Sequence, residues 1–229
     1  KTVEETIRES DLHYPPTRLI ALENTHNYCM GSPITREYMQ QVGNLAKRYN
    51  LKIHVDGARI FNAAVALRVD VKDLVREADS VMFCLSKGLS APVGSLVCGH
   101  KEFIHKARKW RKMVGGGMRQ SGHLAAAGII ALSDLVDQLK KDHSNAQKLA
   151  QGLARLKGIV LKPELIKTNI IFFSLKHRTP NPKAFLENLE AQGIKILMIQ
   201  SGVFRAVLHR EISESQIEQV IRALEELTK

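Results

Sequence analysis

The sequence predicts an α/β fold, with a mostly parallel sheet in its first part and a smaller α+β unit in its last part. Two observations carry this prediction. Short, β-rich apolar runs alternate with amphipathic helical segments through the first part of the chain, which is typical of strand–helix–strand crossovers. After about residue 157 the pattern changes, and two strands follow one another directly at 195–200 and 203–209.

The strands of the first part are the clearest signals. Four runs are rich in β-branched and other apolar residues: "RLIALEN" (18–24), "KIHVD" (52–56), "SVMFCL" (80–85) and "GSLVCG" (94–99). Parallel sheets place ligand sites at the carboxyl ends of their strands. Asp56 and Lys87 fall at such ends, and His26 follows the end of the first strand.

The segments between these strands predict helices. Ser32 as cap and Pro33 at the first position favour a helix that runs to about Tyr49. Further helices are expected over about 59–67, 71–78 and 101–112, and the stretch 121–157 is helical in composition.

The last part reads as a small α+β unit. Strands are expected at 168–175, 195–200 and 203–209, and helices at 181–193 and 213–227, with Ser213 as a cap. We place the boundary near residue 140, so that 1–140 belong to a large domain and 141–229 form a small carboxyl-terminal α+β domain.

Composition excludes some classes of protein. Of the 229 residues 44% are hydrophobic and 25% charged, which is ordinary for a globular chain. No apolar run approaches the ~20 residues that span a bilayer, so we expect no membrane partner. The chain has a net charge of +11, with Lys and Arg spread along it and one denser cluster at 101–112. A solvated amphipathic helix, an anion site at its end and a nucleic-acid surface are three interpretations. We expect no nucleic acid, because no recognition motif accompanies the charge.

The three cysteines, Cys29, Cys84 and Cys98, include no CxxC pair. We expect neither a metal site nor a disulfide framework, with Cys84 and Cys98 in the core. Reduced cysteines favour an intracellular protein, in the cytoplasm or the mitochondrial matrix. The chain lacks a starting methionine and reads like the middle of a protein, so a targeting segment could lie upstream.

Lys87, in "FCLSKGLSAPVGS", is a candidate nucleophile. A lysine attacks a carbonyl only when it is deprotonated, and burial or a nearby cation favours the neutral amine. The preceding apolar strand is expected to supply burial and Gly88 flexibility. The alternative is an ordinary lysine at a strand end.

Asp56, in "IHVDGAR", is the second candidate. A carboxylate at the end of a buried strand is costly unless it has a partner. That partner is either Arg59, in a structural ion pair, or a protonated ring nitrogen such as that of pyridoxal phosphate. One strand–helix–strand crossover would bring Asp56 and Lys87 to neighbouring strand ends.

Four motifs in this order resemble the low-specificity L-threonine aldolases: "ENTHN" (23–27), "HVDGAR" (54–59), "LSKGLSAPVGS" (85–95) and "RKMVGGGMRQSG" (111–122). These are pyridoxal-phosphate enzymes of the beta-eliminating lyase/threonine aldolase group. The resemblance implies their three-layer, type I transferase fold. The family's amino-terminal part, with its phosphate loop and a histidine that stacks on the ring, has no counterpart here, so we expect a fragment.

The resemblance also implies roles for single residues. Lys87 would form the Schiff base with pyridoxal 5'-phosphate, Asp56 would bind its ring nitrogen and Arg59 would lie beside the ring and the substrate carboxylate. Arg205, in "GVFRAVLH", matches the family's carboxylate-binding arginine. A planar guanidinium suits that role, but a surface strand arginine is the alternative.

Four further residues follow from the same resemblance. Lys112 and Arg119 flank the triple glycine 115–117, which in the family approaches the cofactor phosphate, in the neighbouring subunit's site. A flexible hairpin with incidental charge is the alternative. His13 matches a family histidine near the substrate's hydroxyl, and His26 lies within the family signature "ENTHN"; either could position or deprotonate a β-hydroxyl. For a single histidine, a structural role is the alternative.

The function implied is retro-aldol cleavage of L-threonine, L-allo-threonine and related β-hydroxy-α-amino acids to glycine and an aldehyde. A homo-oligomer, dimer or tetramer, with shared active sites is expected. Two alternatives stay open. One is another pyridoxal-phosphate β-eliminating lyase, and the other is a non-catalytic basic binding protein.

Overall fold

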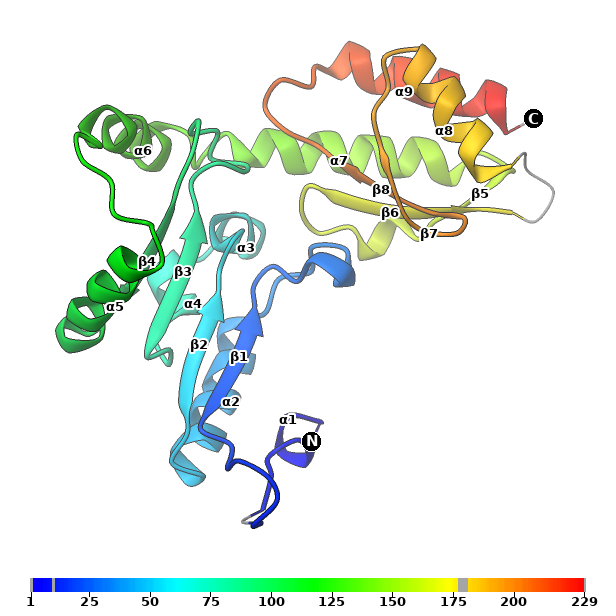
Figure 1. The fold of residues 1–229 in the computed structure, drawn as a ribbon. Coiled ribbons are helices and arrows are strands. Elements are labelled where there is room, and N and C mark those ends of the chain that lie inside the picture. Colours follow the sequence, from blue (N-terminus) through cyan, green and yellow to red (C-terminus); the bar gives the residue numbers. More distant parts are fainter. Residues whose placement is uncertain (1, 10, 177–180, 229) are drawn as a thin grey trace. The chain divides into compact units, whose positions relative to one another are not determined.

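The computed structural model describes residues 2–9, 11–176 and 181–228. The chain divides into two compact units (Figure 1). The first contains Lys1–Thr25 and Ile34–Ser133, and the second contains His26–Pro33 and Asp134–Lys229. Each unit has its own sheet and its own hydrophobic core. Among the described residues, no helix has the length and apolar character needed to cross a membrane.

The first unit contains a four-stranded sheet in the order β1-β2-β3-β4. Strands β1, β2 and β3 are parallel, and β4 pairs antiparallel with β3. The predicted mostly parallel sheet is therefore confirmed. The elements of this unit are α1 (Thr2–Glu5), β1 (Leu19–Glu23), α2 (Arg36–Arg48), β2 (Lys52–Asp56), α3 (Ile60–Leu67), α4 (Val71–Leu74), β3 (Ser80–Cys84), β4 (Ser95–Gly99), α5 (Lys101–Met113) and α6 (Gly122–Asp134).

Strand β2 shows how this unit builds its core. Ile53 and Val55 alternate with more exposed neighbours, so both lie on one face of the sheet. They pack with Met39 and Val42 of α2 and with Ile60 of α3. On the other face, His54 Nδ1 lies 2.8 Å from Ser80 Oγ, so each side chain has a polar partner across neighbouring strands.

Two predictions for this unit were wrong in detail. Helix α2 begins at Arg36, and Thr35, not Ser32, caps it by accepting a hydrogen bond from the Tyr38 N–H. The Ser32 backbone is instead used in a turn, where its carbonyl accepts from the His26 N–H. Cys98 is exposed rather than buried, because β4 forms the edge of the described sheet.

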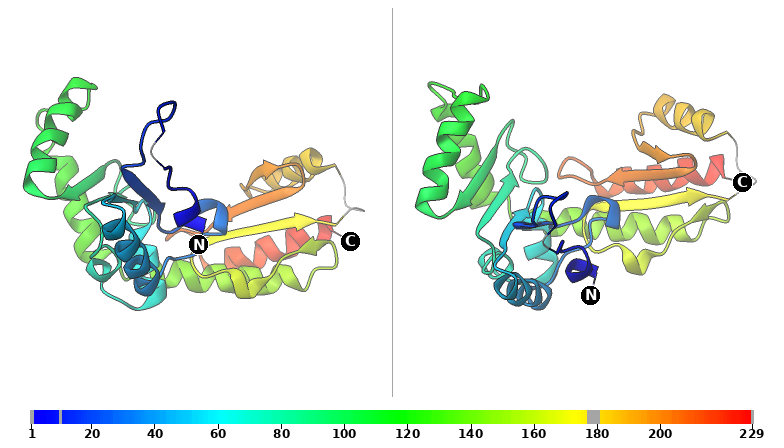
Figure 2. Two further views of the ribbon diagram at one scale, coloured as in Figure 1. Left: turned by 90° about the horizontal axis from the view of Figure 1, so that it is seen from below. Right: turned by 60° about the horizontal axis from the view of Figure 1, so that its bottom comes forward.

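The second unit contains an antiparallel sheet in the order β5-β6-β8-β7. Its elements are the one-turn helix η1 (Asn27–Cys29), α7 (Leu139–Ala154), β5 (Ile159–Val160), η2 (Pro163–Leu165), β6 (Ile170–Leu175), α8 (Pro182–Ala191), β7 (Leu197–Gln200), β8 (Val203–Val207) and α9 (Glu214–Leu227). Helices α7 and α9 run side by side over one face of the sheet in both further views (Figure 2).

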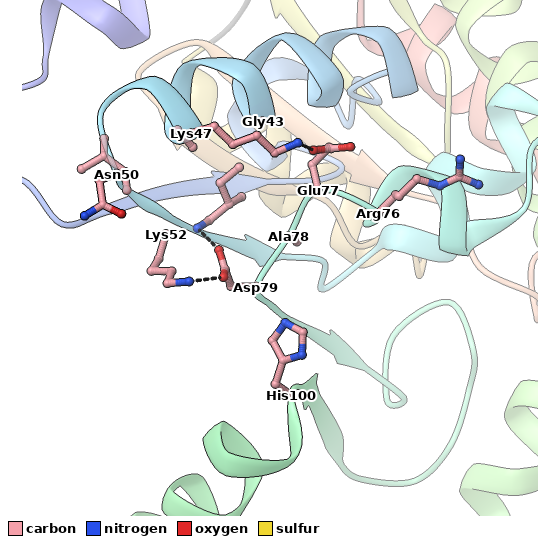
Figure 3. A pocket seen from close by; sticks show the side chains of 12 residues that line it. Gly43, Lys47, Asn50, Lys52, Arg76, Glu77, Ala78, Asp79 and His100 are labelled. Carbon is pink, nitrogen blue, oxygen red and sulfur yellow. Dashed lines mark hydrogen bonds and ion pairs between the residues drawn. The ribbon is translucent and has the colours of Figure 1, made fainter.

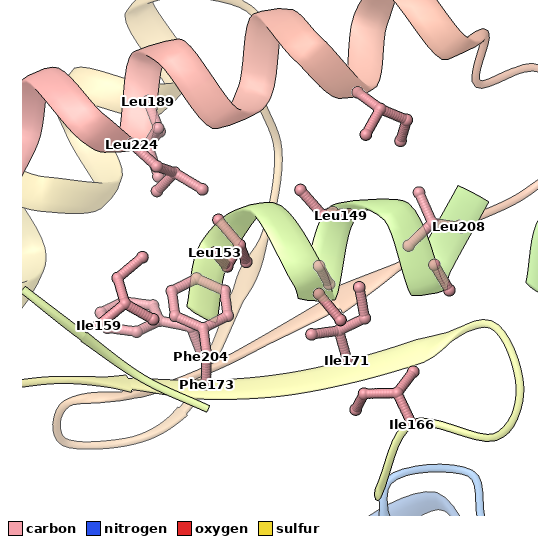
Figure 4. Close-up of a cluster of buried hydrophobic side chains, with 14 of the residues drawn as sticks. Leu149, Leu153, Ile159, Ile166, Ile171, Phe173, Leu189, Phe204, Leu208 and Leu224 are labelled. Atoms are coloured by element: carbon pink, nitrogen blue, oxygen red, sulfur yellow. The ribbon is translucent and has the colours of Figure 1, made fainter. Parts of the chain in front are cut away.

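The core of this unit lies between that face and the helices. The rings of Phe173 and Phe204 stack with centroids 5.4 Å apart, and Phe185 of α8 lies 5.0 Å from Phe204 (Figure 4). Leu149 and Leu153 of α7 complete the same cluster. The predicted small α+β unit is confirmed in its helices and in its three longer strands, whereas the two-residue strand β5 was not predicted.

Candidate active site

Asp56 and Lys87 follow neighbouring parallel strands. Asp56 is the last residue of β2 and pairs with Met82 of β3. Strand β3 ends at Cys84, and Lys87 comes three residues later. The strand–helix–strand crossover inferred from the sequence therefore exists, with α3 and α4 between β2 and β3. Both residues lie at the edge where parallel sheets place their ligands.

Lys87 lies in the connection between β3 and β4, whose backbone is tied at three points. The Leu85 N–H donates to Gly94 O (2.9 Å), the Ala91 N–H to Leu85 O (3.0 Å) and the Ser90 N–H to Lys87 O (2.9 Å). Leu85 and Leu89 are buried, whereas Lys87 is exposed. The expected burial of the amine is therefore not found in this chain. The buried leucines anchor the loop and leave the lysine side chain in the open.

The stretch after Asp56 is fixed in the same way. Asp56 Oδ1 accepts from the Ala58 N–H (3.1 Å), and the Gly57 N–H donates to Met82 O (2.8 Å). A Cβ at position 57 would meet that same oxygen at 2.8 Å, so only glycine fits where the chain passes β3. Arg59 is half-buried at the start of α3. The motif thus presents an exposed carboxylate on a rigid backbone.

The glycine loop folds back on the end of α5. The Gly115 N–H donates to Lys112 O (3.2 Å) and the Gly116 N–H to Arg111 O (2.8 Å). Gly115 has φ +88°, and a Cβ at Gly117 would lie 2.6 Å from Lys112 Cδ. The glycines therefore allow close approach to the helix end. Lys112, in the last turn of α5, and Arg119, which follows the glycines, are both exposed.

His13 is not brought to this edge. It lies in an exposed segment ahead of the amino end of β1, where its N–H donates to Asp11 Oδ1 (2.6 Å). Asp56 and Lys87 follow the carboxyl ends of strands that run parallel to β1. In Figure 1 the segment before β1 lies beyond the opposite ends of those strands. The predicted role of His13 stays a prediction.

Arg205 and His26 both belong to the second unit. Arg205 lies on β8 between Phe204 and Ala206, whose side chains enter the core on the helix side, so Arg205 points to the other face. It is half-buried, and its Nε has no hydrogen-bond partner among the described residues. Burial lowers the pKa of the Arg205 guanidinium, and the nearby Tyr28 opposes that shift. Tyr28 was not predicted, because an exposed tyrosine carries no sequence signal.

A hollow of about 550 Å³ lies elsewhere on the first unit, at the amino ends of β2 and β3 (Figure 3). Asp79 accepts there from Lys52 Nζ (2.8 Å) and from the Ile53 N–H (2.9 Å). Burial opposes ionisation of Asp79, but these donors outweigh it and hold the pKa below its ordinary value. Because its charges pair with one another and no predicted site residue lines it, we interpret this hollow as structural.

Comparisons with known proteins point to one family. Residues 1–176 match the family model described as beta-eliminating lyase. The chain is 42% identical over 229 residues to low-specificity L-threonine aldolase 1 of Arabidopsis thaliana, which covers 99% of this chain and 64% of the relative. It is 42% identical over 214 residues to the low specificity L-threonine aldolase of Escherichia coli K12, covering 93% and 61%.

Solved structures share the fold of this chain. A solved threonine aldolase from Leishmania major superposes with a TM-score of 0.78 at 18% identity, over 99% of this chain and 66% of that one. At that identity the likeness concerns the fold alone, and it confirms the predicted type I α/β architecture. The chain spans about three fifths of the length of the two curated relatives, 64% and 61%.

Proposed function

We propose that this chain, which belongs to the beta-eliminating lyase family, is part of an aldehyde-lyase that cleaves L-threonine and related β-hydroxy-α-amino acids to glycine and an aldehyde. The observation that carries the proposal is the position of Asp56 and Lys87 after the adjacent parallel strands β2 and β3. The names of the relatives, low-specificity L-threonine aldolases, supply the substrate class.

The residues at this edge suit pyridoxal 5'-phosphate. Asp56 offers an exposed carboxylate for a protonated ring nitrogen, on a backbone that Gly57 lets pass close to Met82. Lys87 offers an exposed amine from an anchored loop. Arg59, at the start of α3, is three residues from Asp56 and is the candidate neighbour of the ring oxygen. When bound, the cofactor supplies an aldehyde that amines attack and a ring that delocalises an electron pair.

The phosphate of the cofactor would be held by cations. Lys112 and Arg119 are exposed on either side of the glycine loop, whose backbone can approach a ligand closely. Charge-assisted hydrogen bonds from such side chains are the strong kind that a phosphate accepts. We assign these two residues to phosphate binding, in the same or a neighbouring subunit.

Arg205 would hold the substrate carboxylate. Its guanidinium is half-buried, so its charge is partly removed from water, and a carboxylate would supply a charged acceptor for it. A planar fork fixes the direction in which the rest of the amino acid points. That orientation decides which bond of the substrate breaks, because the bond held in the reactive direction is the one that cleaves.

Protons move at two atoms in this proposal, the oxygen of the β-hydroxyl and Cα. A base, for which we propose His26 because His13 lies ahead of the amino end of β1, takes the proton of the β-hydroxyl. The Cα–Cβ bond breaks, and the hydroxyl carbon leaves as the carbonyl of the aldehyde. The electron pair left at Cα takes up a proton, which yields glycine. The Lys87 amine, neutral when it acts, displaces the product amine and so closes the cycle.

An oligomer with shared sites fits the surface of the first unit. Apolar side chains are exposed along α5, the glycine loop and α6, with Trp110 62%, Met113 63%, Val114 78%, Met118 65% and Ile129 67% exposed. Exposed apolar side chains mark protein interfaces where they gather into one patch. We propose that a second copy covers them. Location in the cytoplasm or the mitochondrial matrix stays a prediction.

One experiment tests the proposal directly. The protein, both as this chain and extended to the full length of its relatives, is loaded with the cofactor, reduced with borohydride and mapped by mass spectrometry. A pyridoxyl group on Lys87, together with glycine and acetaldehyde formed from threonine, is the expected result. Ammonia and a keto acid would instead indicate a β-eliminating lyase. Absence of both activities, with salt-sensitive oligonucleotide binding, would indicate a basic binding protein.

A further inference from the structure

The segment His26–Pro33 lies against part of the sheet face that carries Arg205. Arg205 pairs with Phe172 of β6, so Ile170, two residues along β6, shares that face. Ile170 is fully buried, and a Cβ at Gly31 would lie 3.3 Å from its side chain. The segment therefore lies against β6 on the side to which Arg205 points.

This segment is a compact turn with fixed geometry. The Gly31 N–H donates to His26 O (3.0 Å), and the Ser32 N–H donates to Cys29 O (3.0 Å). Thr168 Oγ1 ties the turn to the sheet by donating to Gly31 O (2.8 Å). Tyr28 lies in the middle of the turn, in η1, and its side chain is 71% exposed. The position of Tyr28 is thus set by the sheet that holds Arg205.

Tyr28, carried by this turn, lies near enough to Arg205 to oppose the lowering of the guanidinium pKa by burial. Both are hydrogen-bond donors at neutral pH. The Arg205 guanidinium is half-buried, and Tyr28 is open to a ligand. Two neighbouring donors, one of them cationic, form a place for an anion rather than for a cation or a neutral group.

We propose that Tyr28 is a second carboxylate-binding residue, whose hydroxyl donates a hydrogen bond to the same carboxylate that the Arg205 guanidinium binds. The inference rests on the proposed function, which supplies an amino acid as the ligand. Two donors from different elements hold both oxygens of the carboxylate, which fixes its rotation as well as its position. Tyr28 therefore selects ligands with a free carboxylate over amines that lack one.

The test compares two ligands on the full-length, cofactor-loaded protein. Glycine has the carboxylate, whereas ethanolamine has the same amine without it. Binding of each is measured by titration calorimetry for the wild type and for Tyr28→Phe, which keeps the ring and removes the hydroxyl. We expect glycine to bind about tenfold more weakly to the variant, and ethanolamine to bind equally to both. The KM for threonine should rise by the same factor, while kcat changes less than about twofold.

Tyr38→Phe is the matched control, because Tyr38 is an exposed tyrosine (42%) on α2 of the first unit. It should leave the affinities for glycine and ethanolamine unchanged, and likewise the KM and kcat for threonine. Unchanged glycine affinity in Tyr28→Phe overturns the inference, and so does equal weakening of glycine and ethanolamine. If Arg205→Lys weakens glycine but Tyr28→Phe does not, the inference falls and the proposed function stands. If the wild type binds no glycine, both fall.

Discussion

Thr168 and Gly31 are 137 positions apart in the chain, yet Thr168 Oγ1 donates a 2.8 Å hydrogen bond to the carbonyl of Gly31. The bond is buried, and a Cβ added at Gly31 would lie 2.4 Å from Thr168 Oγ1. Gly31 also has φ +66°, which disfavours any side chain. This contact joins the turn that carries His26 and Tyr28 to the sheet that carries Arg205.

Thr168→Val tests how much this contact stabilises the second unit. Valine keeps the shape but leaves the buried Gly31 carbonyl without its donor, so we expect a loss of about 1–3 kcal/mol in the free energy of unfolding. Urea denaturation followed by circular dichroism measures it. The exposed Thr6 offers a control, since its hydroxyl bonds within its own turn, to Val3 O. An equal loss in Thr6→Val would contradict a special role for Thr168.

Asp142 predicts a pH dependence of stability. This side chain on α7 is fully buried, and Gln138 is close enough to favour its charged form, although neither carboxylate oxygen has a hydrogen-bond partner of good geometry among the described residues. Burial raises the pKa of Asp142 to about 6, against the opposing effects of Gln138 and Arg210. The folded state then binds the proton more tightly than the unfolded one. The protonated carboxyl therefore stabilises the folded state fully below pH 3.8, which is the pKa of the group in the unfolded state. This stabilisation is lost as pH rises through about 6.

Asp142→Asn should therefore be more stable than the wild type at pH 8, by about 1–3 kcal/mol, and the difference should vanish near pH 4. His143 has the opposite trend, because burial lowers its pKa to about 4. Taking the difference between variant and wild type at each pH removes that contribution. Asp137→Asn is the control, as this side chain is 84% exposed. If Asp142→Asn were less stable than the wild type at pH 8, the carboxylate would have to form favourable interactions in the folded state.

Much of the fold could be predicted because its signals are local. The run "KIHVD" became β2, and Ser213 caps α9, as their residue types favour. The errors arise where a contact with a residue distant in the sequence determines the local conformation. Ser32 looks like a helix cap, but its backbone bonds to His26 and Cys29 in a turn held by Thr168. No local pattern could assign residues 26–33 to the second unit, nor indicate that Tyr28 lies near Arg205.

Ser213→Ala tests the local signal itself. Ser213 Oγ accepts from the Gln216 N–H (3.3 Å), and Gln216 Oε1 accepts from the Ser213 N–H (2.7 Å). Removing this capping box should cost about 1 kcal/mol of unfolding free energy, measured by thermal or urea denaturation. Ser213→Asp keeps an acceptor at the cap and should stay close to the wild type. If Asp is as destabilising as Ala, the cap is not what fixes this helix end.

Lys87→Ala tests the proposed nucleophile. Lys87 is exposed and its loop is held by backbone bonds, so the fold should survive unchanged in circular dichroism. We expect kcat with threonine to fall about a thousandfold or more. Lys87→Arg should be equally inactive, because arginine stays protonated. The exposed Lys72→Ala on α4 is the control. Activity within a few-fold of the wild type in either Lys87 variant would sink the assignment.

Lys112→Ala separates a specific phosphate contact from the general basic charge of α5. Lys112 lies along the glycine loop, with its Cδ near Gly117, whereas Lys109 lies earlier on the same exposed helix. Loss of one charge-assisted hydrogen bond should weaken cofactor binding about 10- to 100-fold in Lys112→Ala, measured by fluorescence titration. Lys109→Ala removes the same charge and should change it by less than about twofold, since exposed charges are screened. Equal effects of both variants would mean that the helix acts through its net charge, and that Lys112 makes no contact of its own with the phosphate.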